Sequence, residues 1–109
     1  MRMWMVPPEM MCKNHLLGEH LEIHMFVGAI NKNKNIKGYL NGLLEFDSIE
    51  SRHNELAIEM IKRGYNHNSP LPDILFKIEN KKIDVLKNIA ELLRRCEQCR
   101  KRYDEEFPF

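Results

Sequence analysis

The spacing of apolar residues most constrains what this chain can fold into. These residues return every three or four positions, and no segment shows the two-residue alternation of a β-strand. The first such run extends from about Pro8 to Ile30, between Pro7 and the polar stretch 31–37. A proline in the first turn suits the start of a helix. The apolar positions of this predicted helix are Met10, Leu17, Leu21, Met25 and Ile30.

Two further helices are predicted downstream. Asp47 and Glu50 have the spacing of a capping box, which satisfies free backbone N–H groups at a helix start. Gly64, after two basic residues, is typical of the end of that helix. Another helical pattern runs from about Asn80 to Tyr103. The sequence therefore predicts an all-α fold, as a single domain over residues 1–109 with about three helices.

Composition narrows the class of protein. The chain has 109 residues, of which 43% are hydrophobic and 30% charged, as in a globular domain. No apolar run approaches the roughly 18 residues of a membrane span, and the N-terminus lacks the apolar core of a secretory signal. Three cysteines, an odd number, suggest a reducing cytosol. We therefore expect a cytoplasmic protein without membrane contact. Because the net charge is only +1, nucleic-acid binding would need basic residues gathered on one face.

The segment HLLGEHLEIHMFVGAI, residues 15–30, gathers histidines and glutamates within a predicted helix. His20 and His24 are i, i+4 neighbours, as zinc ligands often are, but HLEIH is not the H-E-x-x-H zinc motif. Two half-exposed side chains are the simpler interpretation. Glu22 lies on a different face, where Gly18 one turn earlier removes side-chain bulk and leaves room for a substrate. Alternatively, Gly18 allows close helix packing and Glu22 pairs with a basic residue, and composition alone favours this alternative.

The same segment carries a family resemblance. It resembles the pyrimidine-dimer DNA glycosylase/AP lyase family, in which a bacteriophage member reads HLMAEYRELPRVFGAV without a gap. RHNELAIEMIKRGYN, residues 52–66, is similar to RQIELIAECLKRGFN in that protein. The gapless similarity extends back to the N-terminus, where Arg2 meets an arginine, whereas residues 70–109 match poorly.

The resemblance implies a mechanism that needs no cofactor and no metal. In this family the α-amine of the first residue attacks C1′ of the damaged nucleotide, expels the base and forms a Schiff base, and β-elimination then cuts the strand. α-Amines have reference pKa values of about 7.7–8.0, so a useful fraction is neutral and nucleophilic near pH 7. Arg2 is too large for methionine aminopeptidase to remove Met1, and the alignment places Met1 on the family's first residue. We therefore expect the Met1 amine as nucleophile and Glu22 as catalytic carboxylate.

The resemblance also implies a partner, namely double-stranded damaged DNA, bound by a monomer that is nucleoid-associated while on DNA. Leu21 and Met25 stand where the bacteriophage protein has arginines, so other residues must contact the phosphates. Basic groups fix the register of a protein on a duplex, although a run of charges is often only a solvated face. The expected DNA-binding residues are Arg2, Asn14, His15, Lys32, Lys34, Lys62, Arg63, Arg94 and Arg95.

The expected function is therefore that of a DNA-repair glycosylase with AP lyase activity, with cyclobutane pyrimidine dimers as the expected lesion. Two alternatives stay open. The changed arginine positions suggest a non-catalytic protein that binds damaged or bent DNA, and a glycosylase for a different lesion is also consistent with the sequence.

Cys96 and Cys99, in the sequence CEQC, raise the question of a metal or redox site. Zinc would need two further ligands, which only Cys12 or a histidine could supply. On the apolar stripe of a predicted helix, these cysteines are most simply small buried hydrophobes. We therefore expect no bound metal.

Overall fold

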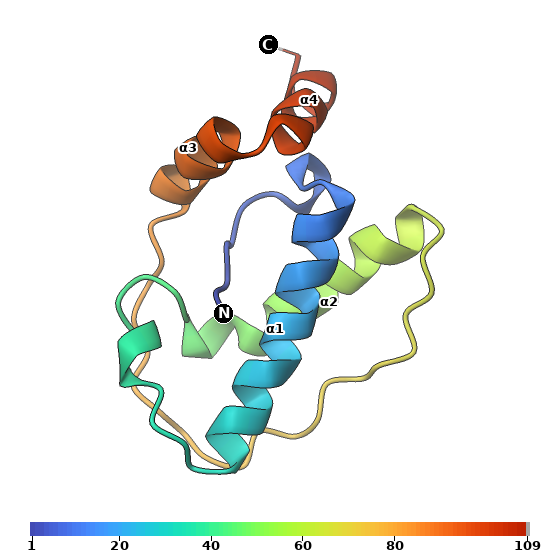
Figure 1. Cartoon of the computed structure of the whole chain (residues 1–109). Coiled ribbons are helices and arrows are strands. Elements are labelled where there is room, and N and C mark those ends of the chain that lie inside the picture. Colours follow the sequence, from blue (N-terminus) through green and yellow to red (C-terminus); the bar gives the residue numbers. More distant parts are fainter. Residues whose placement is uncertain (109) are drawn as a thin grey trace.

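The computed structural model describes residues 1–108, which form four α-helices and three short 3₁₀-helices without a strand. The predicted all-α fold is confirmed. α1 and α2 cross and pack against each other, while α3 and α4 form a second pair near the start of α1 (Figure 1). In the described part of the chain, no helix has the length and hydropathy of a membrane span. The elements are η1 (Pro8–Met10), α1 (Lys13–Asn31), η2 (Lys37–Tyr39), η3 (Phe46–Ser48), α2 (Ile49–Lys62), α3 (Val85–Arg95) and α4 (Glu97–Glu106).

The first helix begins later than predicted. The prolines start the short turn η1, the backbone is extended at Met11 and Cys12, and α1 begins only at Lys13. The predicted apolar stripe is also partly wrong, because Leu21 and Met25 are 60% and 48% exposed. Packing against α2 selects a different face of α1. Its buried apolar residues are Leu16, Ile23, Phe26, Val27 and Ile30.

The sequence predicted both ends of α2, and the structure agrees with only one of the two predictions. The predicted capping box is wrong: Asp47 belongs to η3, and the helix starts after Ser48 without a side-chain cap. The C-terminal signal is confirmed. Gly64 has φ +83°. Its N–H donates to the Ile61 carbonyl at 2.9 Å, and the N–H of Tyr65 donates to the Met60 carbonyl at 2.9 Å. This double closure is a Schellman motif, which a glycine accommodates without strain.

The predicted third helix is divided in two. Asp84 caps the start of α3 by accepting a hydrogen bond from the N–H of Lys87 at 3.1 Å. The helix then ends at Cys96, whose φ of −123° and ψ of 108° are extended. The thiol of Cys96 in turn caps α4, because it accepts from the N–H of Cys99. Residues 1–108 thus contain four α-helices where the sequence predicted about three.

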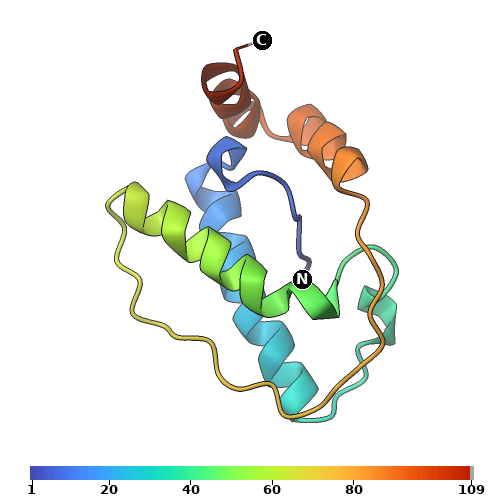
Figure 2. The ribbon, with the colours of Figure 1, turned by 180° about the vertical axis from the view of Figure 1, so that it is seen from behind.

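Residues 63–84 contain no helix and pass around the C-terminal end of α1 on their way to α3 (Figure 2). The Asn31 side chain holds this segment there, since it donates to the Asp73 carbonyl at 2.9 Å and accepts from the N–H of Leu75 at 2.8 Å. Further along, the N–H of Ile83 donates to Glu45 at 2.8 Å. These contacts bring α3 back to the N-terminal part of the chain.

A buried ion pair joins α1 to α2. The guanidinium of Arg52 donates from Nε to Glu19 Oε2 at 2.6 Å and from Nη2 to Oε1 at 2.9 Å. The two side chains are 1% and 0% exposed. A bidentate pair of this kind offsets part of the cost of burying both charges and fixes the register of the two helices.

Candidate active site at the N-terminus

The N-terminal segment is anchored along its length. It runs through the middle of the molecule between the two helix pairs (Figure 1), with Met3, Trp4 and Val6 buried. The N–H of Met3 donates to the Leu43 carbonyl at 2.7 Å, and the Asn88 side chain donates to the Trp4 carbonyl at 2.8 Å. These contacts fix the position of the first residue.

The anchored amine faces the predicted catalytic carboxylate. The Met1 α-amino nitrogen lies 4.0 Å from Glu22 Oε1, with the two side chains 18% and 31% exposed. The backbone N–H of Arg2 points to the other carboxylate oxygen, Oε2, at 3.4 Å. One oxygen of Glu22 is therefore held by the backbone, and the other is directed at the amine in a partly open position.

Gly18 does not serve helix packing. A Cβ added at this position would have no heavy atom within 4 Å. The alternative that Gly18 allows a close helix contact is therefore wrong. Glu22, one turn further on, pairs with the α-amine and not with a basic side chain.

Arg2 and Arg95 gather around Trp4 on the other side of the N-terminal segment. The guanidinium of Arg2 lies 3.6 Å from the centroid of the indole, and that of Arg95 lies 5.6 Å from it. Arg2 also donates to Asn88 at 3.1 Å and pairs with Glu91 at 3.4 Å. These contacts attach α3 to the segment that carries the amine.

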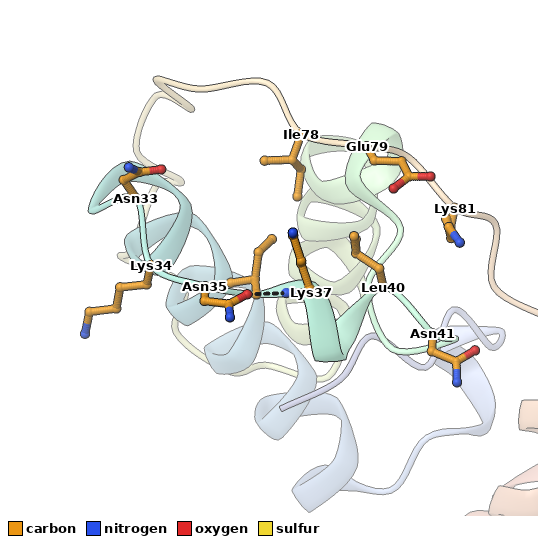
Figure 3. Close-up of a pocket in the computed structure, with 10 residues that line it drawn as sticks. Asn33, Lys34, Asn35, Lys37, Leu40, Asn41, Ile78, Glu79 and Lys81 are labelled. Carbon is orange, nitrogen blue, oxygen red and sulfur yellow. Dashed lines mark hydrogen bonds between the residues drawn. The ribbon is translucent and has the colours of Figure 1, made fainter.

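Two hollows with lysines lie near the amine. Met1 lines a hollow of about 420 Å³ together with Met25, Lys32 and Lys34. A larger hollow of about 710 Å³ lies between residues 33–41 and 78–81 and shares Lys34 with it (Figure 3). The structure thus brings Lys32 and Lys34, two predicted DNA contacts, to the side of Met1.

Further lysines, which are not in the set of expected contacts, also line hollows on this side of the molecule. Lys37 and Lys81 line the larger hollow (Figure 3). Lys82 and Lys87 line a third one, of about 480 Å³, together with Arg2. Periodicity could not reveal Lys81 and Lys82, because they lie in an irregular segment that only tertiary contacts bring to this face.

The remaining predicted contacts lie elsewhere. Asn14 and Arg63 line a separate hollow of about 310 Å³, in which neither Met1 nor Glu22 takes part. Arg63 is engaged within the protein, because it pairs with Glu59 at 2.8 Å and donates to the Pro8 carbonyl at 3.0 Å. Three predicted contacts are exposed and lie beyond these hollows, namely Lys62, Arg94 and Arg95. The DNA contacts of all these residues stay predictions.

Two groups of metal-ligating side chains lie outside the Met1–Glu22 pair. Cys12, His15, Cys96 and Cys99 form one, and His20, His24 and His53 form the other. Burial, followed by the nearby charges of Arg95 and Arg2, lowers the pKa of His15. Burial, with the neighbouring histidines acting in the same direction, lowers the pKa of His20 to about 4. Both imidazoles are therefore neutral at pH 7.

The chain is thus an all-α protein in which an anchored α-amine lies beside a carboxylate, next to a hollow lined by two lysines. The description of the matching family is more specific: pyrimidine dimer DNA glycosylase, over residues 1–73. The chain belongs to this family, and is thus a DNA-repair glycosylase that acts on damaged DNA. No curated protein and no solved structure matches the chain. The matched range contains Met1 and Glu22, whereas α3 and α4 lie beyond it.

Proposed function

We propose that this glycosylase is also an AP lyase, that it acts on cyclobutane pyrimidine dimers in double-stranded DNA, and that the α-amine of Met1 is its nucleophile. The observation that carries the proposal is the distance of 4.0 Å between that amine and Oε1 of Glu22. Binding alone would need neither a fixed amine nor a carboxylate beside it. A free amine at the end of an anchored segment can reach a sugar carbon without the four-carbon stem of a lysine.

The chemical steps balance with these two groups and one water molecule, which hydrolyses the imine after strand cleavage and frees the Met1 amine. The neutral amine forms a bond to C1′ and gives up a proton, and the glycosidic bond breaks. The pyrimidine keeps the bonding electrons and takes up a proton, while its cyclobutane bonds still join it to the neighbouring pyrimidine. Loss of the ring oxygen's bond to C1′ gives an iminium ion between C1′ and the Met1 nitrogen. A proton then leaves C2′, the C3′–O bond breaks, and the strand is cut. Glu22 stabilises the cationic sugar and moves protons between these steps.

The surface beside Met1 supports a role in holding DNA. Lys32 and Lys34 line the same hollow as Met1. In this proposal they supply phosphate contacts, which position a duplex without reading its sequence. Leu21 and Met25 are exposed on the same helix as Glu22. In this proposal they contact opened bases instead of phosphates. A damaged step costs less to open than an intact one, so such apolar contacts favour lesions.

The experiment is an incision assay with untagged, deformylated protein on three duplexes that carry one cis-syn thymine dimer, one abasic site or no lesion. We expect cleavage of the first two and not of the third. Cleavage at the abasic site alone would contradict the assigned lesion and support a glycosylase for another one. Specific binding of the dimer duplex without cleavage of any substrate would instead support the non-catalytic alternative.

A further inference from the structure

We propose that Cys12, His15, Cys96 and Cys99 form a structural zinc site that ties the start of α1 to the junction of α3 and α4. The four ligand atoms lie within 4.8 Å of one another. This site is independent of the amine chemistry, since none of its ligands is Met1 or Glu22. It also supplies the two further ligands that the CEQC motif lacks by itself, one cysteine and one histidine.

The distances between ligand atoms agree with a tetrahedral zinc ion. Zinc lies about 2.3 Å from thiolate sulfur and about 2.0–2.1 Å from imidazole nitrogen, so tetrahedral ligands are about 3.8 Å apart for two sulfurs and about 3.6 Å for sulfur and nitrogen. The sulfurs of Cys12 and Cys96 are 3.8 Å apart. His15 Nδ1 lies 3.5 Å from the Cys99 sulfur and 3.2 Å from that of Cys12. A disulfide would need the sulfurs near 2.05 Å, and all three cysteines are free.

The backbone around the site also suits thiolates. Cys12 and Cys96 are the N-cap residues of α1 and α4, and each of the other two ligands follows three positions later in the first turn. The N–H of Cys12 points to the Cys99 sulfur at 3.2 Å, and the N–H of Cys99 points to the Cys96 sulfur at 3.4 Å. Helix N-termini and backbone donors stabilise negative sulfur. The arrangement is two similar half-sites, C-x-x-H and C-x-x-C, that face each other.

The site explains the unexpected break in the C-terminal helix. The predicted continuous helix is interrupted at Cys96, and this break turns the Cys96 and Cys99 sulfurs toward Cys12 and His15. It also fixes α3, which carries Asn88 and holds the N-terminal segment through the Trp4 carbonyl. Zinc would therefore stabilise a domain whose last two helices make few other links to α1 and α2.

The test is cobalt substitution of reduced, untagged, full-length protein. Tetrahedral Co²⁺ bound to thiolates gives sulfur-to-cobalt charge-transfer absorption in the near ultraviolet, which zinc should then abolish by displacement. We expect one such ion per chain, loss of the absorption in Cys99→Ser, and a fall of the melting temperature by roughly 10 °C or more when a chelator removes zinc from the wild type. The wild-type measurements decide the question even if the variant does not fold.

Two results would overturn the zinc site. One is saturating Co²⁺ without charge-transfer absorption, together with a melting temperature that neither zinc nor chelator changes. The other is a Cys12–Cys96 disulfide that forms in the presence of zinc and is found by peptide mapping under non-reducing conditions.

A second site is carried by a different observation. Four imidazoles converge from α1, α2 and the segment 63–84, with ring centroids 4.8 Å apart for His20–His53 and for His20–His67. His20 Nε2 lies 2.9 Å from His67 Nε2. Among the described residues, the buried Nε2 of His24 has no hydrogen-bond partner. We infer that His20, His24 and His53, whose ligand nitrogens lie within 4.8 Å of one another, bind a divalent first-row transition ion, with Zn²⁺ as the probe, and that this ion satisfies the free nitrogen. His67 supports the site through its contact with His20.

The variant His67→Asn tests this second site, since His67 lies in a segment without a helix and its loss should leave the fold intact. The wild type should bind two equivalents of Co²⁺, only one of which gives thiolate absorption. His67→Asn should bind the second equivalent at least ten-fold more weakly and keep the thiolate signal, which serves as the internal control. A wild type that binds a single equivalent, which gives the thiolate signal, would overturn the histidine site.

Discussion

The Met1 α-amine and the Glu22 carboxylate face each other across 4.0 Å. The N–H of Arg2, 20 positions before Glu22 in the sequence, holds the other carboxylate oxygen. The N-terminal segment brings the amine to the helix, and Gly18 leaves the space beside it open. In the proposed mechanism, the two facing groups have different chemical roles. The amine forms the covalent bond, and the carboxylate stabilises charge and moves protons.

Glu22→Gln should lower the rate of base excision by at least about 100-fold, because the amide cannot carry the negative charge or the proton. The fold should remain, since the two side chains are nearly isosteric. Single-turnover incision of the dimer duplex measures the rate, and a binding assay measures the affinity. Glu50→Gln, an exposed site on α2, is the matched control. Equal rates in the two variants would remove Glu22 from the mechanism.

Lys32→Ala combined with Lys34→Ala should weaken DNA binding and reduce its dependence on salt. Each phosphate contact that is lost should lower the slope of log K against log salt by about 1. The two lysines line the hollow next to Met1. Lys77→Ala removes an exposed lysine outside this hollow and should leave the slope unchanged. A slope that responds only to Lys77 would place the DNA elsewhere on the molecule.

Arg52→Ala should destabilise the protein by about 3–5 kcal/mol, because it leaves Glu19 buried without its partner. The double variant Glu19→Leu with Arg52→Met should lose much less, since no uncompensated charge remains. Urea denaturation followed by circular dichroism measures both. If the double variant were as unstable as the single one, packing and not the unpaired charge would account for the loss.

The metal-free protein should lose stability as the pH falls from 6.5 toward 4. The pKa of His20 is lowered from 6.5 to about 4 in the fold, first by burial and then by His53, His24 and His67. The unfolded chain therefore binds more protons in this range, and the stabilisation is complete only above the unfolded pKa. Denaturation in the presence of chelator at a series of pH values measures the effect. His20→Gln should flatten the curve between pH 6.5 and 5, and an unchanged curve would assign the dependence to other groups.

The sequence predicted the helical class, the position of α2 up to Gly64, and the pair Met1 and Glu22, because these depend on local periodicity, on a glycine end signal and on a family resemblance. It did not predict the break at Cys96. At that break the Cys96 sulfur lies 3.8 Å from the sulfur of Cys12, far away in the chain, and a local helical pattern contains no information about such a contact. The exposed positions of Leu21 and Met25 were missed for a similar reason, since only the packing of α2 decides which face of α1 is buried.

The clusters of cysteine and histidine side chains could not be predicted from the sequence for the same reason. CEQC and HLEIH are each half of a ligand set, and each is weak evidence by itself. In the fold, Cys12 and His15 lie next to the CEQC cysteines, and His53 lies next to the histidines of HLEIH. Only the fold brings the halves together, so the sequence favoured small buried hydrophobes at the cysteines and half-exposed side chains at the histidines.

The most direct test of the central claim is to trap the Schiff base with borohydride on an abasic duplex and to map the adduct by mass spectrometry. We expect one covalent adduct per chain, on the α-nitrogen of Met1, and none after that amine has been acetylated. The acetylated protein should still bind the duplex. An adduct on a lysine, or strand cleavage by the acetylated protein at the wild-type rate, would contradict the assignment of Met1 as the nucleophile.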